Sequence, residues 1–222
     1  MRRLLNCLLG WLSGASSAPA APRVPQDPVP AAKLSLPLVP SVPSAPLPGL
    51  PETLKAHRQW VETEGREGRR AELAQASLRQ AALFMASLRR ASLRGADLRR
   101  AEIQWADLGG AYLEGANLAG ADLFQSNLEG ARLAGAILRE AGLLSANLAG
   151  ADLEGADLEG ADLKGASFRG ARLAGARLVR ADLRGADLSG ARGLSWDQLS
   201  EAVRDDTTRL PEGLAPAGGE ER

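Results

Sequence analysis

The chain has 222 residues, of which 45% are hydrophobic but only 4% aromatic, which indicates one domain with a narrow core plus extensions. Its 27 basic and 27 acidic residues balance, so the chain as a whole is neither a polyanion nor a polycation. The single cysteine, Cys7, excludes an intrachain disulfide and a cysteine-based metal cluster.

Residues 1–20 have the pattern of an export signal. Arg2 and Arg3 precede a short apolar run at residues 4–12, and small residues follow up to Ala20. The run is too short to cross a bilayer, so we expect no transmembrane span. We predict a signal peptide and an exported protein, periplasmic or extracellular. The alternative is a disordered, Leu-rich N-terminus on a cytoplasmic protein.

Residues 21–51 are predicted to be a disordered, proline-rich linker. Between residues 19 and 51 lie 11 of the 13 prolines. Proline removes an amide donor and fixes φ, which favours a solvated extended chain. We expect this segment to act as a tether. The alternative is a ligand segment that a partner recognises.

Residues 52–70 are predicted to form a capping helix and its lead-in. Leu54 and Val61 lie on one face of a helix that starts after Pro51. The chain's only histidine, His57, has no second histidine or nearby cysteine to work with. We therefore expect it to be a packing or surface residue of this helix, and not a catalytic base or a metal ligand.

Residues 71–190 follow a single five-residue pattern through 24 consecutive units. Every unit begins with Ala except at Ser126, and its third residue is Leu except at Ile103 and Phe168. In an α-helix a period of five would rotate successive Leu residues by about 140°, so they would share no face. In a continuous strand an odd period would alternate them between faces. The pattern therefore predicts a short extended piece and a turn in every unit, with glycine, the commonest fifth residue, at the corner.

A chain that turns the same way in every unit closes into coils, and stacked coils pair their backbones at a spacing of about 4.8 Å. Leu fills the interior and Ala leaves room beside it. A disordered tract would not keep phase over 24 units. The first coil would expose unpaired amides and leucines, and we expect the helix at 52–70 to cover it.

The units resemble the pentapeptide-repeat family, most clearly at Ala96–Leu98, Ala121–Leu123 and residues 151–165 (ADLEGADLEGADLKG). The segment around His57 and the ending GLSWDQL at 193–199 are similar to the flanks of many such arrays. This resemblance implies an all-β fold, a right-handed quadrilateral parallel β-helix with four units per coil. It would have about six coils over residues 71–193 and short capping helices at both ends.

The chain after the array is predicted to form a second capping helix over residues 194–204. Ser195 and Gln198 fit a capping box at its start. Residues 205–222 are predicted to be a disordered tail. We expect three apolar side chains to cover the last coil: Leu194, Leu199 and Val203.

With four units per coil, residues 20 apart stack in outward columns. Five apolar side chains then gather on one side of coils one to four, together with Gln104. An exposed apolar patch marks an interaction site unless something covers it. We predict a surface for an unknown protein partner or for self-association, and the alternative is coverage by the capping helix or the linker. The five residues are Phe84, Met85, Trp105, Phe124 and Leu144.

Charge is distributed unevenly along the array, with basic residues in coils one and two and acidic residues in coil five. Opposite charges stack in several columns, for example Arg139 with Glu159, and Asn127 can form an amide ladder with Asn147. The basic residues make a candidate patch for an acidic surface, although we do not expect nucleic acid as a partner. The alternative is a solvated face. The candidate basic patch is Arg89, Arg90, Arg94, Arg99 and Arg100.

The sequence shows no arrangement of nucleophile, base and oxyanion donors, no phosphate loop and no metal-ligand spacing, so we predict no catalytic, cofactor or metal site. We predict a non-enzymatic scaffold or protein-binding module, exported and held on the linker. The family resemblance supplies an alternative, a cytoplasmic inhibitor or protector of a DNA-handling enzyme such as gyrase, because one branch mimics DNA with a strongly negative surface. The array carries 15 acidic and 14 basic residues, so such mimicry lacks its electrostatic basis here.

Overall fold

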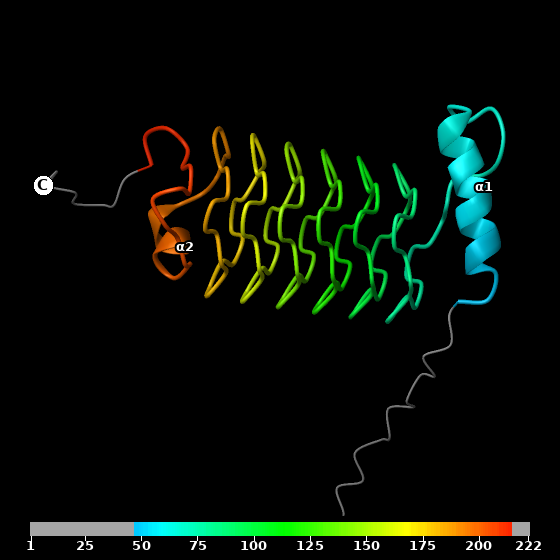
Figure 1. Cartoon of the computed structure of the whole chain (residues 1–222), viewed down its shortest axis with the longest axis horizontal. Coiled ribbons are helices and arrows are strands. Elements are labelled where there is room, and N and C mark those ends of the chain that lie inside the picture. The colour runs from blue at the N-terminus through cyan, green and yellow to red at the C-terminus, as the bar shows by residue number, and fades with distance from the viewer. Residues whose placement is uncertain (1–46, 215–222) are drawn as a thin grey trace, which may run out of the picture. The chain divides into compact units, whose positions relative to one another are not determined.

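Residues 71–190 form a stack of coils in the computed structural model, which describes residues 47–214 (Figure 1). Parallel β-bridges join the second residue of each unit to the residue 20 positions later, from Glu72 with Ser92 to Arg172 with Arg192. Four units therefore complete one coil. The predicted signal peptide, the linker up to residue 46 and the tail from residue 215 lie outside the described residues.

The coils are numbered from residue 71 in steps of 20, so coil one is 71–90 and coil six is 171–190. Each coil has four sides, and each side is one unit. Sides one to four of coil one begin at Ala71, Ala76, Ala81 and Ala86. Residues 20 apart therefore occupy the same place on the same side of successive coils.

Backbone hydrogen bonds between coils repeat in every unit. The N–H of the third residue donates to the carbonyl of the second residue one coil later, as from Leu73 to Ser92 at 2.7 Å. The N–H of that second residue donates back to the first residue of the preceding coil, as from Ser92 to Ala71 at 2.9 Å. In coils two to five the extended part of each unit is thus paired as in a parallel sheet, on both neighbouring coils.

The core is one column of inward side chains along the axis. The first and third residues of the units are almost all less than 2% exposed, including the large Phe168 in a Leu position. Ser126, the one unit that does not begin with Ala, is 1% exposed and its Oγ donates to the Leu123 carbonyl at 2.8 Å. That hydroxyl is satisfied within its own turn, so the exception does not leave a buried polar atom unpaired.

Helix α1, Leu50–Glu62, lies beside the first coil (Figure 1). It begins two residues earlier than predicted because Leu50 is buried in the core cluster. His57 is fully buried, stacks on Trp60 with ring centroids 5.5 Å apart, and its Nδ1 accepts a hydrogen bond from Ala71 N at 3.0 Å. His57 therefore fastens α1 to the start of coil one.

Helix α2, Trp196–Ser200, is shorter than the predicted helix over 194–204. Its capping box forms, since Ser195 Oγ accepts from Gln198 N and Gln198 Oε1 accepts from Ser195 N. Leu199 is fully buried, as expected, but Val203 is 47% exposed and does not cover the last coil.

The chain after α2 returns to the stack. Val203 bridges Asp182 and Arg209 bridges Asp187, which extends two sides beyond coil six. The Oδ1 atom of Asp205 holds this return by accepting from Gly185 N at 3.2 Å and from Thr207 N at 3.1 Å. The prediction of a disordered tail is therefore wrong for residues 205–214. Backbone pairing with coil six orders these residues.

Candidate protein-binding face

The five apolar residues predicted to share a surface do lie on side three of coils one to four. Phe84, Met85, Trp105 and Leu144 are 57%, 63%, 52% and 38% exposed, and Phe124 is partly buried. The Trp105 and Phe124 rings meet edge to face, with centroids 5.5 Å apart and planes at 84°. We call these five residues the apolar face.

Helix α1 borders the apolar face without covering it. Pro51, Leu54 and Arg58 of α1 line a groove of about 260 Å³ together with Phe84 and its neighbours. Phe84 nevertheless keeps more than half of its surface in solvent. Of the two predicted covers, α1 leaves the face open, and the linker up to residue 46 lies outside the described residues.

The corners of side three hold side chains in coils one to four. The fifth residues in coils one to four are Met85, Trp105, Gln125 and Ser145, with φ of 54°, 60°, 49° and 57°. The left-handed conformation costs a residue with a side chain about 1–2 kcal/mol. In coils five and six, where the apolar residues stop, the same corner reverts to glycine. Side two also has side chains at four left-handed corners, Gln80, Arg100, Glu140 and Arg180, so strain alone does not distinguish the apolar face.

The polar groups within this face are fixed by hydrogen bonds. Gln104 Nε2 donates to Asp122 Oδ2 at 2.8 Å, and Asp122 Oδ1 accepts from Phe124 N at 3.0 Å. The carboxylate is thereby held against its own turn, and the ring of Phe124 keeps a defined position beside Trp105. A partner would meet a preorganised surface.

The structure separates the five arginines of the candidate basic patch. Arg94 lies on side one, Arg99 and Arg100 on side two, and Arg89 and Arg90 on side four. Three of them face carboxylates: Arg94 with Glu114 at 3.2 Å, Arg99 with Asp97 at 2.5 Å, and Arg89 with Asp107 at 3.7 Å. All five arginines lie in coils one and two, but they face different sides of the stack and do not form one surface.

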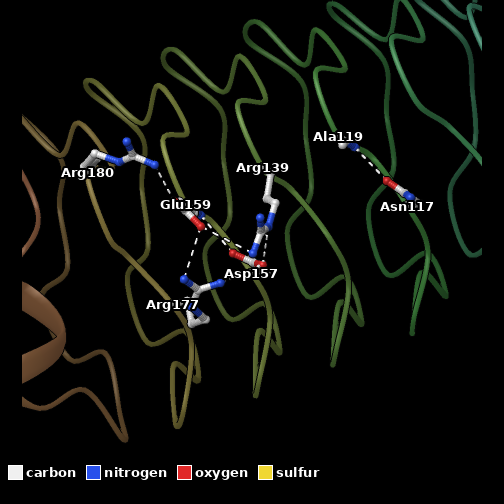
Figure 2. A network of polar contacts seen from close by, with 7 residues as sticks. All are labelled: Asn117, Ala119, Arg139, Asp157, Glu159, Arg177 and Arg180. Carbon is white, nitrogen blue, oxygen red and sulfur yellow. Dashed lines mark hydrogen bonds and ion pairs between the residues drawn. The ribbon is translucent and has the colours of Figure 1, made fainter. Parts of the chain in front are cut away.

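The acidic coil five is likewise neutralised locally (Figure 2). Arg139 pairs with Asp157 at 2.6 Å and with Glu159 at 3.3 Å, and Arg177 contacts the same two carboxylates. A hydrogen bond from Arg180 lowers the pKa of Glu159 below its usual range. The predicted amide ladder also forms, with Asn147 Nδ2 donating to Asn127 Oδ1 at 3.1 Å.

One cluster was missed by the sequence analysis. Three guanidinium groups surround the ring of Tyr112 on side one: Arg94 at 4.4 Å, Arg132 at 5.5 Å and Arg70 at 5.7 Å from its centroid. The 20-residue step from Tyr112 to Arg132 could have indicated part of it. Arg70 comes from the lead-in, which has no repeat to place it.

Within residues 47–214, no group of three or more His, Cys, Asp or Glu residues is arranged to hold a metal ion. No helix in the same residues is long and apolar enough to cross a membrane.

Comparison with known proteins assigns the array to one family. A model described as pentapeptide repeats matches residues 71–115, 116–155 and 151–190, just over half of the chain. No curated protein matches the chain.

The chain is similar to three solved structures from cyanobacteria. HetL from Nostoc sp. strain PCC 7120, a pentapeptide repeat protein involved in heterocyst differentiation regulation, is 37% identical over 65% of this chain and 70% of its own, with a TM-score of 0.40. Rfr23 from Cyanothece 51142 is 38% identical over 47% and 63%, with a TM-score of 0.26. The protein alr5209 from Nostoc is 36% identical over 53% and 78%, with a TM-score of 0.40.

Proposed function

This chain belongs to the pentapeptide-repeat family, a family of right-handed β-helices, and from that premise we propose that it is a non-enzymatic protein-binding module. The β-helix holds the apolar face rigid, and the face takes the apolar side chains of a protein partner. A repeat scaffold is suited to this role because its backbone fixes each outward position and leaves the outward residue free to vary.

The observation that carries this proposal is the exposure of mutually packed apolar side chains on side three. Exposed aromatic residues that pack with one another are typical of binding surfaces. Met85 and Trp105 also occupy left-handed corners at which glycine would be less strained. Core packing does not explain them, because both are more than half exposed. We therefore infer that they contact a partner.

The electrostatics do not favour DNA mimicry. The carboxylates of coil five are paired with arginines or with Lys164, so the described surface lacks a continuous negative stripe. No observation supports the inhibitor of a DNA-handling enzyme over the apolar contact.

Export and tethering complete the proposal. The support is the sequence alone: the basic and apolar pattern of residues 1–20 and the prolines of residues 21–51. Mass spectrometry of the protein recovered from its native cell checks it, and we expect a mature N-terminus near Ala21 in an extracytoplasmic fraction. An intact Met1 terminus in the cytoplasm contradicts export and leaves the binding function standing.

Affinity capture with matched variants tests the binding function. Immobilised full-length chain is compared with the double variant Trp105→Ser and Phe124→Ser, and with Ile137→Ser, which removes an exposed apolar residue from side two. We expect proteins retained by the original chain and by Ile137→Ser to be lost from the double variant. Light scattering on the same samples detects self-association. Identical retention and identical mass for all three would contradict the proposal.

A further inference from the structure

The first coil has an open edge. In every later coil the N–H of a second residue donates to the coil before it, as Glu102 does to the carbonyl of Ala81 at 3.0 Å. No coil precedes coil one. Among the described residues, the N–H and carbonyl groups of Ala82 and Ser87 have no backbone partner. Ala82 lies on side three and Ser87 on side four, and each has the arrangement of one short parallel strand edge.

Helix α1 pairs with backbone groups only near the start of coil one. His57 accepts from Ala71 N at 3.0 Å, and the Ala56 carbonyl accepts from Arg69 N at 3.1 Å. Sides three and four of coil one have no such contact. There α1 and the coil leave between them the groove of about 260 Å³ that borders Phe84.

The groove has an apolar floor and a basic rim. Its floor is formed by Ala82, Leu83 and Ala86, and Pro51 and Leu54 form its wall. The inner column is also more accessible here, since Ala81 and Ala86 are 5% and 8% exposed while their counterparts one coil later are 1% exposed. A small apolar side chain can enter at this point.

Charge defines the ligand further. Lys55 and Arg58 are exposed and line the groove, and no carboxylate lines it. An acidic chain would find two cations beside the unpaired backbone groups. A basic chain would meet like charge without compensation.

We propose that this edge groove binds an extended, acidic polypeptide segment of a partner, which adds as a parallel strand ahead of coil one. A carbonyl of the segment accepts from Ala82 N, and an N–H two residues later donates to the Ala82 carbonyl. This repeats the two bonds that join each pair of coils, which are 2.9 Å and 2.7 Å long at Ser92. Strand addition of this kind takes affinity from the backbone and specificity from side-chain pockets. The inference rests on the proposed function only in that the ligand is a polypeptide.

A peptide taken from the chain's own acidic coil serves as the probe. Acetylated ADLEGADLEG, residues 151–160, carries the same spacing of Ala and Leu and four carboxylate side chains. It is titrated into isotopically labelled full-length chain while backbone amide signals are followed. We expect saturable shifts at Ala82 and Ser87, and binding weakened roughly tenfold when the first Leu of the peptide is N-methylated.

Two proline variants give the sharpest comparison. Ala82→Pro removes an N–H that donates to no other backbone group, so the coil tolerates it as an edge strand does. We expect it to weaken peptide binding roughly tenfold. Ser77→Pro makes the same change at the equivalent position on side two, and we expect it to bind the peptide as the original chain does. Charge reversal at Lys55→Glu and Arg58→Glu should also weaken binding.

The inference is overturned if the peptide leaves Ala82 and Ser87 unshifted, or if Ala82→Pro and Ser77→Pro bind it equally. Shifts confined to Trp105 and Phe124 would also overturn it. That last result would leave the binding function of the apolar face standing. If the edge groove is the site, the Trp105→Ser and Phe124→Ser double variant should still bind the peptide.

Discussion

The fifth residue of each unit is where backbone conformation and side-chain chemistry conflict most directly. Gly130 has φ of +62°, and a Cβ added there would meet no atom within 4 Å. A substitution at this residue therefore isolates the cost of the left-handed conformation from any steric clash. At Trp105 and Met85 the chain bears the same cost in order to hold a side chain.

We predict that Gly130→Ala lowers the free energy of unfolding by about 1 kcal/mol. Denaturant unfolding of the full chain measures it. Gly142→Ala is the matched control, because Gly142 lacks a positive φ and an added Cβ would make only ordinary contact with Asp122. A Gly130→Ala variant as stable as Gly142→Ala would contradict the strain that we assign to the corners.

The inward and corner positions of the array could be assigned from the sequence because one five-residue period determines them. Each Ala, Leu and corner position follows from its place in the unit, and even Phe168 and Ser126 stay in register. The burial of His57 was not predictable in detail, since its acceptor role depends on how α1 crosses coil one.

At the level of elements, the junction between α1 and coil one depends on a neutral imidazole. Burial lowers the pKa of His57 from its ordinary value of 6.5, and it outweighs the backbone contacts with Arg89 and Arg69, which raise the pKa. Nδ1 can accept from Ala71 N only when it is unprotonated. Between the folded and unfolded pKa values the unfolded chain binds more protons, so stability rises with pH in that range.

We predict that α1 is held firmly at pH 7.5 and loosens as the pH falls below about 6.5 toward 5. The protection of the Ala71 amide against hydrogen exchange measures this. His57 is the only histidine in the chain, so no second imidazole can obscure the result. His57→Asn keeps an acceptor that does not titrate and should remove the pH dependence. Equal pH dependence in both chains would contradict the assignment.

The ends of the stack could be predicted less well than its middle. The capping box at Ser195 was correct, but α2 stops at Ser200 and the chain then pairs with coil six. Val203 lies 21 residues after Asp182 and Arg209 lies 22 after Asp187, so neither keeps the 20-residue step. Because the segment after α2 has no repeat, its register against coil six could not be predicted from the sequence.

For the whole molecule, the 20-residue step is enough to place the apolar face, and the structure brings all five predicted residues together on side three. The same step would have separated the candidate basic residues, which were grouped by height along the axis and not by side. The partner of Arg94, Glu114, lies 20 residues away and was visible in the sequence, whereas Arg89 pairs 18 residues away with Asp107 and Arg99 pairs with Asp97 in its own unit. The identity of the partner is not encoded in the repeat, because the repeat constrains only inward positions.

The central claim is that Trp105 serves a partner and not the core. Replacing it with glycine should relieve about 1–2 kcal/mol of backbone strain. It should also lose about 0.5–1.5 kcal/mol of ring pairing with Phe124 and about 1–1.5 kcal/mol of apolar burial, because Trp105 is half buried, so we expect a net loss of no more than about 2 kcal/mol. Arg100→Gly, at an equivalent left-handed corner on side two, is the control.

The most direct test measures unfolding free energy and partner retention on the same preparation of Trp105→Gly. We predict stability no more than about 2 kcal/mol below that of the original chain together with lost retention or lost self-association, while Arg100→Gly gains about 1 kcal/mol and keeps retention and self-association. A Trp105→Gly chain that loses about 3 kcal/mol or more and still retains every partner would show that Trp105 is a packing residue, and would contradict the account.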